Sequence, residues 1–185
     1  MALCGINAVM FEKIIILLKK LLGFFKVQNQ KNEIEHPSSR LSDQPYLEYS
    51  AELISNLKGE HQQLVTLYVG IQDLFERQQY QNVVEQLSKF KEDFSLHLMQ
   101  ENVKFYAYLE NNLAEESDEL QTIKTYRKDM NQIAHVVVRF LKKWTTQNSL
   151  NESTASEFLQ EYKAIGGALV QRITDEEQHL YTLYR

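Results

Sequence analysis

Cysteine, proline and glycine are all scarce in this chain of 185 residues, which limits the disulfides and the helix breakers that the chain can contain. The one cysteine, Cys4, cannot form an intramolecular disulfide, so we expect a reducing compartment, the cytoplasm. Both prolines, Pro37 and Pro45, precede residue 46, and only six glycines are present. The chain from residue 46 onward therefore contains few helix breakers, which favours long helices over a sheet.

Long apolar runs and an excess of positive charge are missing as well. The uninterrupted apolar run Ile14–Leu18 is far shorter than the ~20 residues that span a bilayer. The net charge of −5 argues against nucleic acid as a partner, because phosphate binding depends on a basic surface. The length and a hydrophobic content of 43% are typical of one soluble globular domain with an extension.

Residues 9–27 form a strongly amphipathic segment, so we expect residues 1–27 to contain an amphipathic helix. Its polar stripe is narrow and rich in lysine, and its flanks do not resemble a secretory signal. Such a helix lies either in a membrane interface or against the bundle of this chain or of a second subunit, as in a homodimer. Residues 28–45 are polar, with proline and serine, which is typical of a flexible linker.

Residues 46–185 show helical periodicity throughout. Helices are expected at about 47–77, 80–112 and 117–147, and from Ser153 or Thr154 to about 184. Four long helices joined by short loops predict an all-α fold, an antiparallel up-down-up-down four-helix bundle.

The second of these helices carries an ionisable pair on an apolar face. At 3.6 residues per turn, Phe94, His97, Glu101 and Phe105 fall on one side. An ionised carboxylate on a buried stripe is costly unless it is paired or bound to a metal. We therefore expect a cationic group, a metal ion or a basic side chain, opposite Glu101.

Ionisable residues also occupy inward positions on the other three helices. His61 lies on the stripe of the first helix and His135 beside that of the third, while the fourth turns Arg172, Glu176 and His179 inward in succession. Histidines and carboxylates on facing bundle helices form non-haem di-iron sites, since imidazole suits iron and carboxylates can bridge two metals. The alternative is that each histidine is an isolated, hydrogen-bonded core residue.

Six side chains are thus candidate metal ligands. They are His61, His97, Glu101, His135, Glu176 and His179. No Ser-His-Asp set, thiol nucleophile or phosphate-binding loop competes with this interpretation, so we expect binding rather than catalysis.

These motifs resemble the hemerythrin-like family of HHE cation-binding domains over roughly residues 50–184. The matching motifs are His61 with Leu64 three residues on, His97-x-x-x-Glu101 with the apolar run after it, His135 with Val138 and Leu141, and the last repeat ending in Glu176. The resemblance implies a di-iron centre that binds or senses dioxygen or nitric oxide, or a role in handling iron.

The last motif departs from the family, because Arg172 stands where the resemblance implies a ligand histidine. His179, one turn beyond Glu176, could substitute for it. Alternatively, the guanidinium of Arg172 bridges Glu101 and Glu176 in place of metal charge, and one or both irons are lost.

The same residues also allow a function of a different class. The Arg172/Glu176 pattern also resembles the last helix of bacterial anti-sigma bundles of the Rsd/AlgQ type. On that interpretation the chain is a metal-depleted helical regulator that binds a protein partner, and its acidic surface would suit a basic one.

Overall fold

The computed structural model describes residues 48–185, so the helix expected within residues 1–27 and the linker expected at 28–45 lie outside the described residues. Within the described part all regular structure is helical, without a strand. No helix in this part combines the length and the apolar character needed to cross a membrane.

Four long helices make up residues 48–185. The first is α2 (Leu53–Glu76), and the third is α5 (Asp118–Trp144). The second helix comprises α3 (Tyr80–Gln100), the π-helical segment η1 (Glu101–Tyr106) and α4 (Ala107–Asn112). The fourth comprises α6 (Ala155–Asp175), the π-helical segment η2 (Glu176–Leu180) and a final 3₁₀ turn, η3 (Tyr181–Leu183). The prediction of a helical bundle is confirmed at this level.

Two helix ends differ from the sequence-based expectation. The first helix begins at Leu53 rather than near residue 47, and the third ends at Trp144 rather than near 147. The start of α5 has a local cause, because the hydroxyl of Ser117 accepts a hydrogen bond from the N–H of Leu120 at 3.1 Å. This contact satisfies a backbone donor that the first helical turn leaves without a partner.

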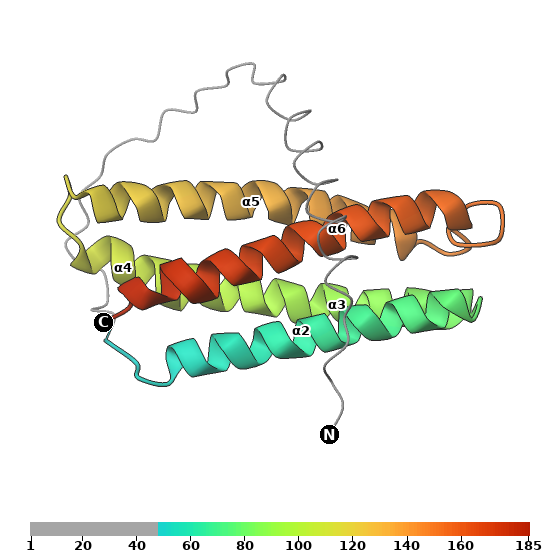
Figure 1. Cartoon of the computed structure of the whole chain (residues 1–185), viewed down its shortest axis with the longest axis horizontal. Helices are drawn as coiled ribbons and strands as arrows, with labels where there is room; N and C mark the ends of the chain where they lie inside the picture. The colour runs from blue at the N-terminus through green and yellow to red at the C-terminus, as the bar shows by residue number, and fades with distance from the viewer. Residues whose placement is uncertain (1–47) are drawn as a thin grey trace, which may run out of the picture.

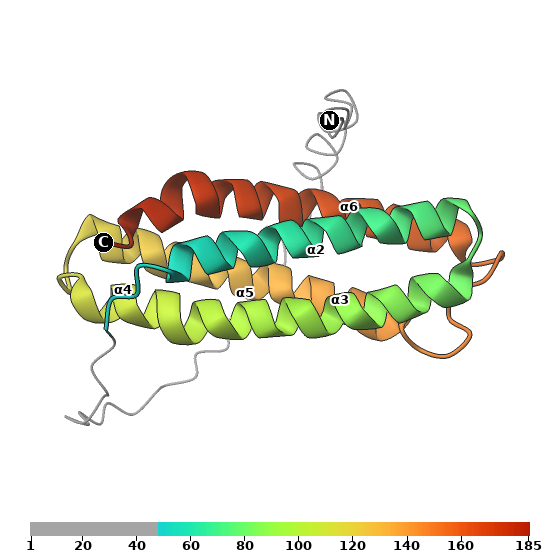
Figure 2. The same cartoon turned by 90° about the horizontal axis from the view of Figure 1, so that it is seen from below.

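The helices lie lengthwise beside one another (Figure 1). The α2–α3 turn and the α5–α6 loop are at one end of the bundle, whereas the α4–α5 loop, the start of α2 and the C-terminus are at the other. The view from below (Figure 2) places α2 and α5 diagonally opposite each other, each flanked by α3 and α6. All four helices therefore contribute to one interior.

That interior contains two apolar clusters instead of one. The larger includes Phe90, Trp144 and Phe158, and the smaller includes Leu57 and Leu180. Complete burial of each such side chain contributes about 1.5–3 kcal/mol, so the two clusters supply most of the drive for folding. Every helix runs from one cluster to the other, and the level between them is where buried polar side chains gather.

The two π-helical segments lie at this polar level. Segment η1 begins at Glu101 and η2 begins at Glu176, so each interrupts its helix at a candidate ligand carboxylate. A π-helical turn is rare and occurs frequently at functional sites. The backbone irregularities thus mark the same layer as the buried charges.

Candidate metal centre

Four ligand-type side chains converge between the two apolar clusters. His61 comes from α2, His97 from α3, Glu101 from η1 and Glu176 from η2. Each offers one ligand atom, and these atoms all lie within 4.8 Å of one another. The four residues are only 1–4% exposed, so the cluster is closed off from bulk water.

Local sequence explains why these side chains point inward. His61 is placed between Leu57 and Leu64 on the buried face of α2, and His97 follows Phe94 on the buried face of α3. The rings of the two histidines lie with centroids 4.7 Å apart. The four-residue spacing from His97 to Glu101 keeps both on one side of the helix.

Two carboxylates outside the cluster orient the histidines. The Nδ1 atom of His61 lies 2.9 Å from Oε1 of Glu177, and Nδ1 of His97 lies 2.9 Å from Oε2 of Glu60. An imidazole whose Nδ1–H donates to a carboxylate presents the Nε2 lone pair on its other side. Both Nε2 atoms therefore face the cluster, which is the arrangement of carboxylate–histidine–metal sites.

The two inner carboxylates each have one oxygen engaged away from the centre. Oε1 of Glu101 accepts a hydrogen bond from the hydroxyl of Tyr181 at 2.9 Å, while its Oε2 is buried without any hydrogen-bond partner. Oε1 of Glu176 accepts from Nε of Arg172 at 2.5 Å, while its Oε2 faces Nε2 of His61 at 3.3 Å. A buried oxygen without a partner costs free energy, so Oε2 of Glu101 is poised for a cation.

Arg172 fills the side of the cluster nearest α5. Its guanidinium is 5% exposed and donates from Nη2 to the hydroxyl of Tyr106 at 2.5 Å and from Nη1 to the carbonyl oxygen of Tyr126 at 3.1 Å. With the bond to Glu176, all three of its nitrogens have acceptors. The alternative in which Arg172 bridges Glu101 and Glu176 is thus met only in part, because the guanidinium pairs with Glu176 and makes no ion pair with Glu101.

Burial changes the proton affinities of the cluster. Desolvation, and then the charge of Glu176, raise the pKa of Glu101 to about 8. Burial alone would lower the pKa of His61, but its hydrogen bond with Glu176 and the charge of that residue outweigh burial and raise it above 6.5. Burial, together with neighbouring His61, lowers the pKa of His97. A cation that enters the cluster competes with these protons.

Two of the predicted ligands do not join the cluster. His135 is exposed on α5, because it lies off the stripe formed by Met130, Val137 and Leu141. His179 is exposed too, and the predicted inward position is wrong. The reason is η2: a π-helix has more residues per turn, so Leu180 takes the buried position that α-helical spacing assigned to His179.

Sequence reasoning also missed contributors to the site. Glu60 and Glu177 resemble ordinary surface carboxylates in the sequence, yet they orient His97 and His61. The available signal was adjacency, since Glu60 precedes His61 and Glu177 follows Glu176. The carbonyl oxygen of Tyr126 could not be predicted from any side-chain pattern.

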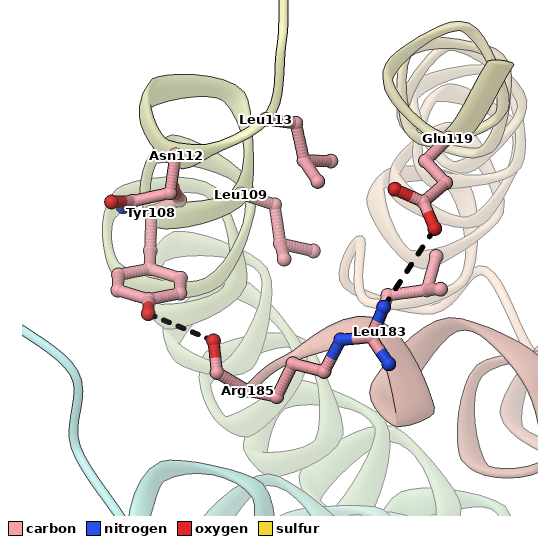
Figure 3. A pocket seen from close by; sticks show the side chains of 7 residues that line it. All are labelled: Tyr108, Leu109, Asn112, Leu113, Glu119, Leu183 and Arg185. Atoms are coloured by element: carbon pink, nitrogen blue, oxygen red, sulfur yellow. Dashed lines mark hydrogen bonds and ion pairs between the residues drawn. The ribbon is translucent and has the colours of Figure 1, made fainter. Parts of the chain in front are cut away.

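A surface pocket of about 180 Å³ lies apart from the cluster. Figure 3 shows Tyr108 donating to the carbonyl oxygen of Arg185 at 3.1 Å, and the guanidinium of Arg185 reaching Glu119 at 3.8 Å. Its remaining lining residues are Leu109, Asn112, Leu113 and Leu183. The pocket shares no residue with the buried His/Glu cluster, and its side chains form no comparable ligand set.

Fold and site together define a helical domain whose buried His/Glu cluster is compatible with metal binding. The sequence model of the hemerythrin HHE cation binding domain matches residues 52–184, and the chain belongs to that family. No curated protein and no solved structure matches the chain. The resemblance inferred from the four motifs is thus confirmed as family membership.

Proposed function

We propose that this protein is a hemerythrin-like non-haem iron protein whose antiparallel up-down-up-down bundle binds or senses dioxygen or nitric oxide, or handles iron. One observation carries the proposal. The buried Oε2 of Glu101 has no hydrogen-bond partner and lies 3.8 Å from Nε2 of His97, in a cluster whose histidines both present Nε2 inward. Such a donor set suits a divalent transition metal, with imidazole and carboxylate both good ligands for iron.

The ligands of this proposed centre are His61, His97, Glu101 and Glu176. Bound iron would supply open coordination positions at which a small diatomic molecule binds. The surrounding chain holds the ligands in place and excludes water. The ring of Tyr181 stacks on His61 with centroids 5.7 Å apart, and Phe105 packs edge-on against Tyr181 at 5.1 Å. This aromatic cover restricts access to molecules of small size.

A metal-depleted regulator that binds a protein partner is the second candidate. The ion pair between Arg172 and Glu176 supports it, because the guanidinium already neutralises one of the two buried carboxylates. In that case a proton on Glu101 neutralises the other, and the raised pKa of Glu101 makes this state accessible at neutral pH.

Elemental analysis of protein purified from iron-rich medium distinguishes the two candidates. The iron protein should retain iron, and His97→Ala should lower its iron content. His135→Ala serves as the matched control, because His135 is exposed and should leave iron content unchanged. A protein that stays free of iron, even after anaerobic reconstitution with Fe²⁺, contradicts the proposal and favours the regulator.

The diatomic ligand requires its own measurement. Nitric oxide added to the ferrous protein without oxygen should change its absorption and electron paramagnetic resonance spectra. Unchanged spectra in protein with full iron content would exclude gas sensing while leaving an iron-binding role.

A further inference from the structure

Each inner carboxylate has only one oxygen left for a metal. Glu176 uses Oε1 for Arg172, and Glu101 uses Oε1 for Tyr181. A carboxylate that bridges two metal ions in the common mode gives one oxygen to each ion, so it uses both. The remaining two Oε2 atoms face the two histidine Nε2 atoms, and together they offer four single donors.

The size of the cluster matches one ion. Donors on opposite sides of a single transition-metal ion are about 4 Å apart, since each bond is about 2 Å long. Two ions of a dinuclear site lie ~3.5–4 Å apart, so donors at its two ends are separated by up to about 7–8 Å. The ligand atoms here lie within 4.8 Å of one another, which a contraction of less than about 1 Å converts into a single coordination shell.

The helix that faces the guanidinium offers no ligand. The buried residues of α5 at this level are Ile123 and Met130, both apolar, and Tyr126 contributes its backbone carbonyl to Arg172. The ligand-type residues of α5 are all exposed: Asp118, Glu119, Asp129 and His135. A second ion on this side would therefore meet a fixed positive charge and no carboxylate or imidazole from α5.

The geometry points to a mononuclear centre in which one divalent cation is held by His61, His97, Glu101 and Glu176, and the guanidinium of Arg172 occupies the place of a second cation. Glu176 then bridges a metal ion and a guanidinium instead of two metal ions. The two carboxylates carry two negative charges, and Arg172 and the divalent ion carry three positive ones. The inner cluster with neutral histidines thus has a net charge of +1, compared with +3 if two divalent ions were added beside Arg172.

This inference rests on the proposed metal site, and the experiment separates the two. Metal-free full-length protein is titrated with Fe²⁺ without oxygen, and iron per chain is measured after removal of unbound metal. One tightly bound ion supports the inference. Two ions overturn it and leave the iron-binding function intact, whereas no bound ion overturns the iron-binding function itself.

Spectroscopy provides a second readout on the same sample. After oxidation, an isolated ferric ion gives a high-spin electron paramagnetic resonance signal that accounts for all of the iron. A pair of ferric ions coupled through an oxygen bridge is silent and has a bridge absorption band. The mononuclear centre predicts the first result, and the second result contradicts it.

Arg172→His tests the part assigned to the guanidinium. The substitution frees Oε1 of Glu176 and adds an imidazole, so iron per chain should rise from one toward two. Arg172→Lys is the matched control. It keeps the positive charge, so this variant should still bind one iron ion per chain. A folded Arg172→His protein that still binds one ion shows that Arg172 does not take the place of a second cation. If that variant fails to fold, the stoichiometry and spectrum of the parent protein still decide between one ion and two.

Discussion

Replacing Glu60 should weaken metal binding although Glu60 does not belong to the ligand cluster. Its Oε2 lies 2.9 Å from Nδ1 of His97, and its Oε1 accepts a hydrogen bond from Nε2 of Gln100 at 2.5 Å. Glu60 therefore fixes both the ring orientation and the tautomer of a proposed ligand. Loss of such an orienting carboxylate typically reduces metal affinity about 10–100-fold.

The expected size follows from this geometry. In Glu60→Ala, Nδ1 of His97 loses its hydrogen bond with this carboxylate, so we expect the metal-binding free energy to weaken by the full range of ~1.4–2.7 kcal/mol. In Glu60→Gln, the amide oxygen can still accept the Nδ1–H bond without the negative charge. The loss of metal affinity should therefore be smaller for Glu60→Gln than for Glu60→Ala.

The assay is a competition titration of Fe²⁺ against a chromophoric chelator without oxygen. Glu76→Ala is the matched control, since Glu76 is an exposed residue of the same helix and accepts a hydrogen bond from Gln72. Circular dichroism verifies that each variant keeps its helices. An affinity of Glu60→Ala equal to that of the parent protein would refute the orienting role.

Three further predictions concern stability and the N-terminal segment. In the metal-free protein, Glu101 has a pKa of about 8 when folded, compared with 4.5 as its ordinary value. The folded state then holds a proton that the unfolded state has lost, so stability should fall by on the order of a few kcal/mol from pH 5 to pH 8. Denaturant unfolding measures this, and Glu101→Gln should reduce the slope to the part that His61 and His97 contribute through their own shifted pKa values. Phe158→Ala should destabilise the bundle by about 3–5 kcal/mol and leave iron per chain unchanged, because Phe158 is completely buried and lies about 27 Å along the helix from Glu176. If residues 9–27 contact membranes, a chain that begins at residue 40 should lose binding to anionic liposomes, and equal binding would contradict that role.

Much of the candidate site could be predicted from the chain alone. His61, His97, Glu101 and Glu176 were predicted to point inward, and the structure brings all four together. For His61 the prediction works because the buried residues Leu57 and Leu64, one turn away on either side, place it on the inward face of a regular helix. It fails where the period changes, as η2 shows for His179, and where a residue lies at the edge of the stripe, as His135 does on α5.

The amino-acid sequence by itself determined the helical class, the positions of the four helices and the polar level inside the bundle. These features depend on local periodicity and on the distribution of apolar residues along each helix. Only the tertiary structure decided which oxygen of each carboxylate is free, and that Arg172 reaches Glu176, Tyr106 and the backbone of Tyr126. Those contacts join residues up to 66 positions apart, and their geometry depends on how the helices are placed side by side. For this reason the sequence could pose the choice between a metal ion and Arg172 as the partner of the buried carboxylates, whereas the packed bundle shows that Glu176 faces Arg172 with Oε1 and His61 with Oε2.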